Sequence, residues 1–417
     1  MKPGGIDWIG DIPTEWKTKK LRYATTLRSE IGFFSEGDTY IGLENIESSS
    51  GKYIQTESEY NEGFYDIVKK GDVLFGKLRP YLEKVYISEI DGFCTGEFLN
   101  FKRFEGSKRY LYYFLLSPGF IEIVNASTYG AKMPRAEWDF IKNLKLPLPP
   151  PAEQQAIAAF LDAQCGQIDN IIAEMERQIE ILKQYKTSLI TETVTKGLDK
   201  AAPQKRSGID WIGKIPEHWE VKRLKYIAVL YPQCDLKTLT SETEVTFLQM
   251  EYIKDGYYIE NTTKLEELNG SYNCFQNDDI LLAKVTPCFE NGNIAIAKNL
   301  SNNFGFGSSE LFVIRAISCN NRFLFYLFQS HFFIDQAICT MTGVAGLKRI
   351  SSDFVENYMF GLPPPKEQQA IAAFLDKKCE DIAGIIADKR QSIEIMRAYK
   401  KSLIYEYVTG KKRVKIT

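Results

Sequence analysis

The sequence has few of the residues that build metal centres and no segment suited to crossing a bilayer. It contains two histidines, and none of its eight cysteines forms a Cys-x-x-Cys pair, so a zinc site of cysteine and histidine ligands is not indicated. No apolar run approaches the roughly 18 residues of a membrane-spanning helix, and no secretory signal follows Met1. We therefore expect a cytoplasmic protein with unpaired cysteine thiols.

The overall charge balance does not by itself indicate nucleic-acid binding. Among 417 residues, 25% are charged, 44% are hydrophobic, and the net charge is −2. These values are typical of a globular chain of two to three domains and exclude a disordered or collagen-like protein. A nucleic-acid ligand would need local basic patches or a partner subunit that supplies the remaining positive charge.

What the sequence does contain is an internal repeat. Residues Gly5–Gly10 return as Gly208–Gly213, at an offset of 203 residues. Residues Glu153–Asp162 return letter for letter as Glu367–Asp376, at an offset of 214. The difference, 214 − 203 = 11 residues, is the net extra length in the middle of the second copy. The two copies predict a pseudo-twofold arrangement.

The middles of the copies match in pattern. Gly71–Pro80 parallels Asp278–Pro287, and both are typical of a strand followed by a turn. Leu111–Phe120 and Leu324–Phe333 each predict one apolar helix. The expected order is a mixed α/β globule, a long helix, a linker, a second globule and a second long helix. Their expected bounds are residues 1–150, 151–197, 198–207, 208–364 and 365–411.

Both long helices carry a heptad pattern. Apolar residues recur every seven positions from Leu161 to Leu189, and a second seam runs from Cys165 to Thr193, which is the pattern of a coiled coil. The second copy keeps the pattern, with one interruption at Lys389. The alternative is a long amphipathic helix packed only on its own globule.

The length of the linker favours an antiparallel pairing of these helices. Helical residues 153–194 would span about 63 Å, whereas the linker reaches at most roughly 36 Å. We therefore predict an α+β fold in which two mixed α/β globules are separated by two long helices paired as an antiparallel coiled coil. Cys165 and Cys379 would then lie at opposite ends, and Lys186 would fall near Glu367 and Asp376.

Motifs for catalysis are incomplete or do not recur. Gly208-x4-Gly213-Lys214 begins like a phosphate-binding loop, but Ile215 follows in place of the Ser or Thr that would hold magnesium. Glu15-x-Lys17 and Glu220-x-Lys222 look like nuclease fragments, yet their offset of 205 does not match the repeat. No nucleophile–base pair occurs in both copies, so we expect no catalytic residues.

Three repeated motifs together resemble one family. Leu-Pro-Pro-Pro-x-Glu-Gln-Gln-Ala-Ile-Ala-Ala-Phe-Leu-Asp occurs at 148–162 and 362–376, and Gly-Ile-Asp-Trp-Ile-Gly-x-Ile-Pro occurs at 5–13 and 208–216. Tyr-Lys-x-Ser-Leu-Ile occurs at 185–190 and 399–404. In this order they resemble the specificity subunits of type I restriction–modification systems, over essentially the whole chain.

The resemblance implies a non-catalytic subunit. Each globule would be a target recognition domain that reads one half of a bipartite, asymmetric site in double-stranded DNA. The helix pair would set the spacing of the halves and dock two modification subunits. The resemblance implies no cofactor in this chain: S-adenosylmethionine would enter with the modification subunits, and ATP and Mg with restriction subunits.

Charge and position nominate the DNA contacts. One turn follows a predicted strand in each copy, and a glycine-containing loop at 128–135 matches one at 342–349. Glycine lets backbone approach phosphate, and arginine can pair with guanine in the major groove. The candidates are Lys77, Arg79, Tyr81, Lys132, Arg135, Lys284, Thr286, Lys348 and Arg349.

The helix entry nominates the partner contacts. Its ten residues are identical in both copies while the globules differ, as expected if one kind of partner docks twice; uneven drift after duplication is the alternative. The candidates are Glu153, Gln154, Gln155, Phe160, Glu367, Gln368, Gln369 and Phe374. An alternative function is a structural adaptor with two protein-binding globules and a dimerising helix pair.

Overall fold

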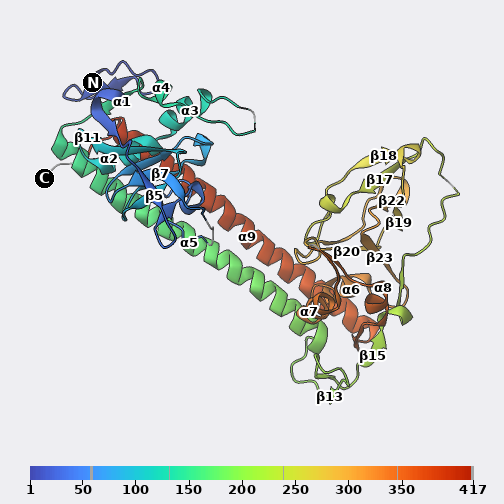
Figure 1. The fold of residues 1–417 in the computed structure, drawn as a ribbon. Helices are drawn as coiled ribbons and strands as arrows, with labels where there is room; N and C mark the ends of the chain where they lie inside the picture. The colour runs from blue at the N-terminus through green and yellow to red at the C-terminus, as the bar shows by residue number, and fades with distance from the viewer. Residues whose placement is uncertain (57–59, 131, 238, 345, 415–417) are drawn as a thin grey trace. The chain divides into compact units, whose positions relative to one another are not determined.

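The computed structural model describes residues 1–56, 60–130, 132–237, 239–344 and 346–414. The chain forms two compact units, Met1–Arg177 with Lys389–Thr417, and Gln178–Asp388. The long helices α5 (Pro151–Lys196) and α9 (Pro365–Val408) each contribute one part to either unit (Figure 1). A unit therefore consists of one globule, the beginning of the helix that follows it, and the end of the other helix.

The first globule is built on two four-stranded sheets, ordered β5-β7-β10-β6 and β4-β11-β8-β9. Their strands are β4 (Thr25–Leu27), β5 (Ile31–Phe34), β6 (Tyr40–Ile41), β7 (Gly63–Val68), β8 (Val73–Gly76), β9 (Val85–Ile87), β10 (Gly92–Cys94) and β11 (Phe98–Phe104). Two-stranded pairs join β1 (Lys2–Pro3) to β2 (Asp11–Ile12) and β3 (Lys17–Lys20) to β12 (Lys145–Leu148). The helices are α1 (Leu21–Ala24), α2 (Lys108–Leu116), α3 (Pro118–Ala126) and α4 (Trp138–Ile141), with 3-10 turns η1 (Leu43–Asn45) and η2 (Pro80–Leu82).

The second globule has sheets β16-β23-β20-β21 and β18-β17-β22-β19. Their strands are β16 (Ala228–Leu230), β17 (Glu244–Leu248), β18 (Thr262–Lys264), β19 (Asn273–Gln276), β20 (Ile280–Ala283), β21 (Ile294–Ile296), β22 (Phe304–Gly307) and β23 (Leu311–Ala316). Two-stranded pairs join β13 (Gln204–Arg206) to β14 (Lys214–Pro216), β15 (Glu220–Arg223) to β26 (Met359–Leu362), and β24 (Thr342–Val344) to β25 (Leu347–Arg349). The helices are α6 (Asn321–Leu327), α7 (His331–Thr340) and α8 (Ser352–Asn357), with 3-10 turns η3 (Leu224–Tyr226), η4 (Met250–Tyr252), η5 (Leu265–Glu267) and η6 (Ser301–Asn303).

The repeat predicted from the sequence is confirmed in the topology. The sheet β4-β11-β8-β9 corresponds strand for strand to β16-β23-β20-β21. Strands β8 and β20 are buried along their whole length, which explains their continuous apolar sequences. In the other sheet β10 and β22 each have one parallel neighbour, β6 and β17, and one antiparallel neighbour, β7 and β19. The edge strands differ, because β5 pairs with β7 whereas β18 pairs with β17.

The prediction of one apolar helix at Leu111–Phe120 and one at Leu324–Phe333 is wrong, since each apolar run is divided between two helices. In the first, α2 ends before Ser117 and α3 begins at Pro118; proline cannot donate a backbone hydrogen bond to a continuing helix but fits a first turn. In the second, the Ser330 hydroxyl accepts from the backbone amide of Phe333 and caps α7. A proline therefore interrupts the first apolar run, and a capping serine interrupts the second.

The antiparallel pairing of α5 and α9 is confirmed within each unit. In the first unit Phe160 packs on Tyr407, with ring centroids 4.5 Å apart, and the Lys400 amine lies 2.7 Å from the Asp169 carboxylate. In the second unit Ile190 of α5 and Leu375 of α9 belong to one buried core. The beginning of each helix therefore lies beside the end of the other.

Two expectations that depended on helix register have different outcomes. Cys165 belongs to the first unit and Cys379 to the second, and both are free thiols, as expected. The Lys186 amine lies 3.0 Å from the Asp255 carboxylate, so its partner is not Glu367 or Asp376. Its charge still lowers the pKa of Cys379, which burial raises overall. The prediction that Lys186 lies near the beginning of α9 is therefore right, but its ion-pair partner, Asp255, lies on a loop of the second globule.

The expectation of unpaired thiols is wrong for one pair of cysteines. Cys234 and Cys274 form a disulfide, with Cα atoms 6.3 Å apart. Cys274 lies on β19, and Cys234 lies in the segment between β16 and β17. The two are separated by 40 residues, and their contact depends on the fold of the sheet, which their spacing does not reveal.

One junction in each unit joins the opening of the globule, the entry of its long helix and the end of the other long helix. The Trp16 indole N–H donates to the Glu153 carboxylate at 2.9 Å, and Trp219 donates to Glu367 at 3.1 Å. Both tryptophans are fully buried. The end of the other helix arrives at the same place, with a glycine at φ 74° (Gly410) against Trp16 and one at φ 75° (Gly197) against Trp219. A left-handed glycine is a common helix terminator. We call these the first and second junctions.

The two junctions offer a matched test. Trp16→Phe and Trp219→Phe remove the same atoms, but the Glu153 side chain is 2% exposed and that of Glu367 is 24% exposed. Because a buried acceptor that loses its donor costs about 1–3 kcal/mol, we expect Trp16→Phe to lower the free energy of unfolding more. Denaturant unfolding of both variants measures the difference. Equal losses would show that the burial of the carboxylate does not set the cost of losing the indole N–H.

Candidate nucleic-acid interface

In the first globule the two predicted loops form one structure, the first loop pair (residues 77–83 and 128–135, of which Ala131 lies outside the described residues). The backbone amide of Arg79 donates to the Pro134 carbonyl at 2.7 Å. An antiparallel bridge joins Leu78 to Arg135, and a second joins Arg135 to Tyr129. The structure thus brings Lys77, Arg79, Tyr81, Lys132 and Arg135 into two loops held together by backbone bonds.

The second loop pair (residues 284–290 and 342–349, with Ala345 outside the described residues) repeats this arrangement. The amide of Thr286 donates to the Lys348 carbonyl at 3.0 Å, and a bridge joins Val285 to Arg349. The Thr286 hydroxyl is used within the pair, because it donates to the Gly346 carbonyl at 2.6 Å. Thr286 therefore shapes the loop, and its hydroxyl is already engaged.

Each loop pair is tied to the globule by the same backbone bonds. Lys77 donates to the Glu97 carbonyl at 2.8 Å and accepts from the Ala136 amide at 3.0 Å. In the second globule Lys284 donates to the Glu310 carbonyl at 3.1 Å and accepts from the Ile350 amide at 3.0 Å. The frame of the two loop pairs is therefore common to both copies, even though most of their side chains differ.

An acidic residue that the sequence analysis missed holds the arginine of each frame. Arg135 forms an ion pair with Glu97, and Arg349 contacts both carboxylate oxygens of Glu310, at 2.9 and 3.0 Å. The Arg349 guanidinium lowers the pKa of Glu310 and the charge of Lys284 adds to this, against the opposing effect of burial. The available signal was an acidic residue just before an apolar strand in both copies. Arg135 and Arg349 thus form ion pairs that hold the loops to the globule.

Other side chains of the loop pairs remain available to a ligand. Tyr81, Tyr129 and Met133 are 50%, 56% and 62% exposed, and Leu347 is 55% exposed. Lys132 and Lys348 are exposed as well. Arg79 is half-buried, and its guanidinium donates to the Lys132 carbonyl at 3.5 Å. Cations beside exposed aromatic rings are the side chains that bind phosphates and stack on bases.

At the helix entry, four of the predicted partner contacts are used inside the units. Glu153 and Glu367 bind the junction tryptophans. Gln154 accepts from the Ser107 amide at 3.0 Å and Gln368 from the Asn320 amide at 2.8 Å, and both glutamines are 2% exposed. Much of the identity between the copies therefore has an explanation in packing.

The other predicted partner contacts remain accessible. Gln155 and Gln369 are exposed. Phe160 and Phe374 are half-buried, and Phe160 covers Tyr407. Of the eight residues nominated as partner contacts, these four are therefore the ones that a partner subunit could reach. Their contact with a partner stays a prediction.

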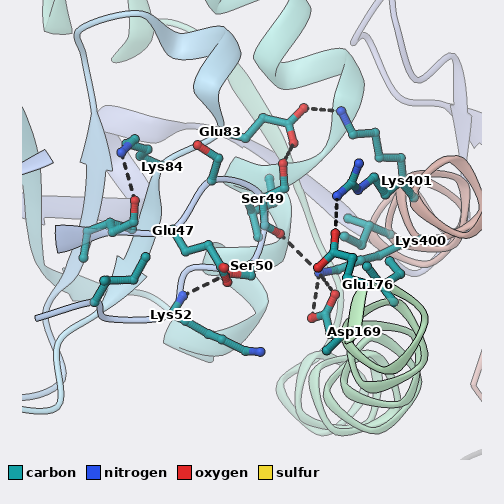
Figure 2. Close-up of a pocket in the computed structure, with 18 of the residues that line it drawn as sticks. Glu47, Ser49, Ser50, Lys52, Glu83, Lys84, Asp169, Glu176, Lys400 and Lys401 are labelled. Atoms are coloured by element: carbon teal, nitrogen blue, oxygen red, sulfur yellow. Dashed lines mark hydrogen bonds and ion pairs between the residues drawn. The ribbon is translucent and has the colours of Figure 1, made fainter. Parts of the chain in front are cut away.

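A cavity of about 860 Å³ lies in the first unit between the globule and its two helix segments. The loop at Glu47–Lys52 faces Asp169 of α5 and Lys400 and Lys401 of α9 (Figure 2). The charged groups are paired across it: Lys400 with Asp169, and Lys401 with Glu83. Glu83 is also the end of the first of the paired loops, so the cavity wall touches the candidate interface.

The described part of the chain shows no cluster of three histidine, cysteine, aspartate or glutamate side chains that could hold a metal ion. Within the same residues, no helix has the length and apolar character that a membrane span requires. Neither observation assigns a cofactor or a compartment.

The type I restriction modification DNA specificity domain matches this chain at residues 30–183 and 216–394. The chain therefore belongs to that family, and its resemblance to type I specificity subunits is confirmed. It is 28% identical to a putative MjaX specificity subunit of Methanocaldococcus jannaschii, over 98% of this chain and 96% of that one. It is 37% identical to the EcoAI specificity subunit of Escherichia coli over 38% of this chain. The matches span 27% and 28% of the length of the EcoAI and EcoEI subunits.

Two solved structures share the fold. A chain from a study of complex assembly and conformational transition of the type I R-M system superposes with a TM-score of 0.73, at 17% identity, over 96% of this chain and 100% of that one. The HsdS subunit from Thermoanaerobacter tengcongensis gives 0.52, at 17% identity, over 96% and 98%. The predicted fold class, two mixed globules with long antiparallel helices, is thus confirmed.

The acidic ties can be tested one globule at a time. Glu97→Gln and Glu310→Gln each keep the side-chain shape but remove the charge that holds an arginine. We expect faster amide hydrogen exchange at Arg79 and Arg135 in the first variant and at Thr286 and Lys348 in the second, because the opening of local structure sets protection. Each variant is the control for the other. Unchanged exchange in both would show that the ion pairs do not hold the loops.

Proposed function

We propose that this chain is the non-catalytic, sequence-specific DNA-binding subunit of a type I restriction–modification complex. The observation that carries the proposal is the loop pair, which is built twice on equivalent backbone bonds but carries different side chains each time. Two globules that share a backbone frame but differ in the side chains of their loops are suited to recognising two different DNA sequences. Each globule would read one half of a bipartite, asymmetric site in double-stranded DNA.

Within each loop pair the contacts divide by chemistry. Exposed lysines such as Lys132 and Lys348 suit phosphates, which position the protein without reading sequence. Arg79 has donors suited to guanine O6 and N7, and Tyr81 presents an exposed ring beside it. Lys77 and Lys284 support the loops through their backbone, and their amines add positive charge at the base of each frame.

The catalytic groups would come from partner subunits. Two modification subunits would dock at the two copies of the helix entry, through the accessible Gln155 and Phe160 and through Gln369 and Phe374. They would bring S-adenosylmethionine, and restriction subunits would bring ATP and Mg. The helix pair would set the spacing of the two half-sites. This assembly would act on DNA in the cytoplasm.

Footprinting tests the bipartite contact. The full chain assembled with its modification subunits should protect two clusters of bases on one duplex, with a less protected stretch between them, because each globule contacts one half-site. Hydroxyl-radical cleavage of a DNA fragment that carries the methylated site measures this. A single continuous footprint that does not depend on sequence would contradict the proposal.

Salt dependence distinguishes a DNA-binding subunit from an adaptor. Phosphate contacts make log K fall with log[salt] by about 0.9 per contact, so Lys132→Ala and Lys348→Ala should each reduce the slope by about one unit at any DNA sequence. Binding of the assembled complex to duplex DNA at several salt concentrations measures it. Unaltered slopes in both variants would exclude these lysines as phosphate contacts, and a complete absence of DNA affinity in the unmodified complex would favour the adaptor.

A further inference from the structure

The first loop pair runs directly into a carboxylate that the second long helix holds. Arg79 and Tyr81 belong to the 3-10 turn η2 and its N-terminal flank, and Glu83 ends that turn. The amide of Leu82 donates to the Arg79 carbonyl and that of Glu83 to the Pro80 carbonyl, both at 2.9 Å. Arg79 and Glu83 have φ of 51° and 53°, values that residues other than glycine adopt only where their surroundings enforce them. Arg79 and Glu83 are thus the two ends of one tight turn.

The Glu83 carboxylate is enclosed by groups from two directions. Its side chain is 10% exposed; one oxygen accepts from the Lys401 amine of α9 and the other from the Ser49 hydroxyl. The preceding lysine, Lys400, donates to the Ser49 carbonyl at 3.2 Å and to Asp169. Figure 2 shows both lysines reaching from α9 toward the globule. Lys400 and Lys401 of α9 thus bind Ser49 and Glu83. Glu83 ends the turn η2, which carries the candidate DNA contacts Arg79 and Tyr81.

These contacts are better suited to fixing a direction than to stabilising the fold. The Lys401 side chain is 46% exposed, and an ion pair with one exposed partner contributes little stability. Loss of the Lys401 cation would nevertheless leave the nearly buried Glu83 carboxylate without its charge partner. Because an unpaired buried charge is unfavourable, the carboxylate would shift toward solvent. The turn that carries Arg79 and Tyr81 would move with it.

Among the described residues of the second globule, no lysine of a long helix holds the matching turn. Glu290 follows Lys284 at the same interval as Glu83 follows Lys77, but it is exposed and forms no ion pair with a described residue. The second turn closes on its own globule, where Phe289 is 3% exposed and its amide donates to the Val285 carbonyl at 2.9 Å. The turn at residues 79–83 is therefore held by the long helix α9, and the matching turn at residues 286–290 is held by the core of its own globule.

We propose that Glu83 and Lys401 are positioning residues for base recognition by the first globule. The ion pair holds η2 on α9 and so fixes the orientation in which Arg79 and Tyr81 meet the first half-site. This inference rests on the proposed function. It makes recognition of one half-site, and not the other, depend on a contact with the helix pair.

The experiment uses the full chain assembled with its modification subunits. A duplex library with both half-sites randomised is methylated, and discrimination is measured at every base position. Glu83→Gln and Lys401→Met should each lower discrimination at one or more positions of the first half-site by about tenfold, as expected when a bidentate base contact is misplaced. The second half-site should be unchanged. Glu290→Gln is the matched control and should leave both half-sites unchanged.

A conservative variant separates positioning from general loss of structure. Lys401→Arg keeps the cation and should keep the discrimination that Lys401→Met loses, at equal melting temperatures. If the unmodified complex selects no bipartite site, the proposed function itself fails. If the unmodified complex selects such a site but Glu83→Gln keeps full discrimination or weakens both half-sites equally, or if Lys401→Arg and Lys401→Met behave alike, the inference about Glu83 and Lys401 is wrong.

Discussion

The hydrogen bond between a buried tryptophan and the first carboxylate of a long helix is the contact on which each unit depends. Trp16 with Glu153 and Trp219 with Glu367 bring together the opening of a globule and the entry of its helix, and the end of the other helix arrives at the same point through a glycine. An acidic side chain at a helix N-terminus is also favoured by the helix dipole. One carboxylate in each unit therefore serves the globule and both helices, which accounts for the glutamate that the two helix entries share.

Each loop pair combines a backbone frame that both copies share with side chains at the ends of the loops that differ between the copies. The strands β8 and β20 and the backbone bonds of Lys77 and Lys284 are equivalent in both globules. The side chains at the tips are not, since Arg79 corresponds to Thr286, whose hydroxyl is already bonded. A repeated frame with unlike tips is what a reader of an asymmetric site requires. It also permits one loop pair to depend on a helix contact that the other lacks.

Much of this organisation could be predicted from the sequence, because repetition and periodicity are properties of the sequence itself. The predicted helices at 151–197 and 365–411 compare with Pro151–Lys196 and Pro365–Val408, and the linker length was sufficient to favour the antiparallel pairing. The carboxylate of Glu97 could not be recognised, because one acidic residue before a strand is like any other until the partner arginine is placed. Identity between the copies likewise could not separate burial, as at Gln154, from contact with a partner.

Mapping adenine methylation shows whether the two globules read two different half-sites for partner enzymes. Single-molecule sequencing of DNA from cells that express this chain with its modification subunits reports every methylated position. We expect one motif with two specified parts of unlike sequence, separated by an unspecified gap of constant length. A motif without a gap, or methylation that does not depend on this chain, would contradict it.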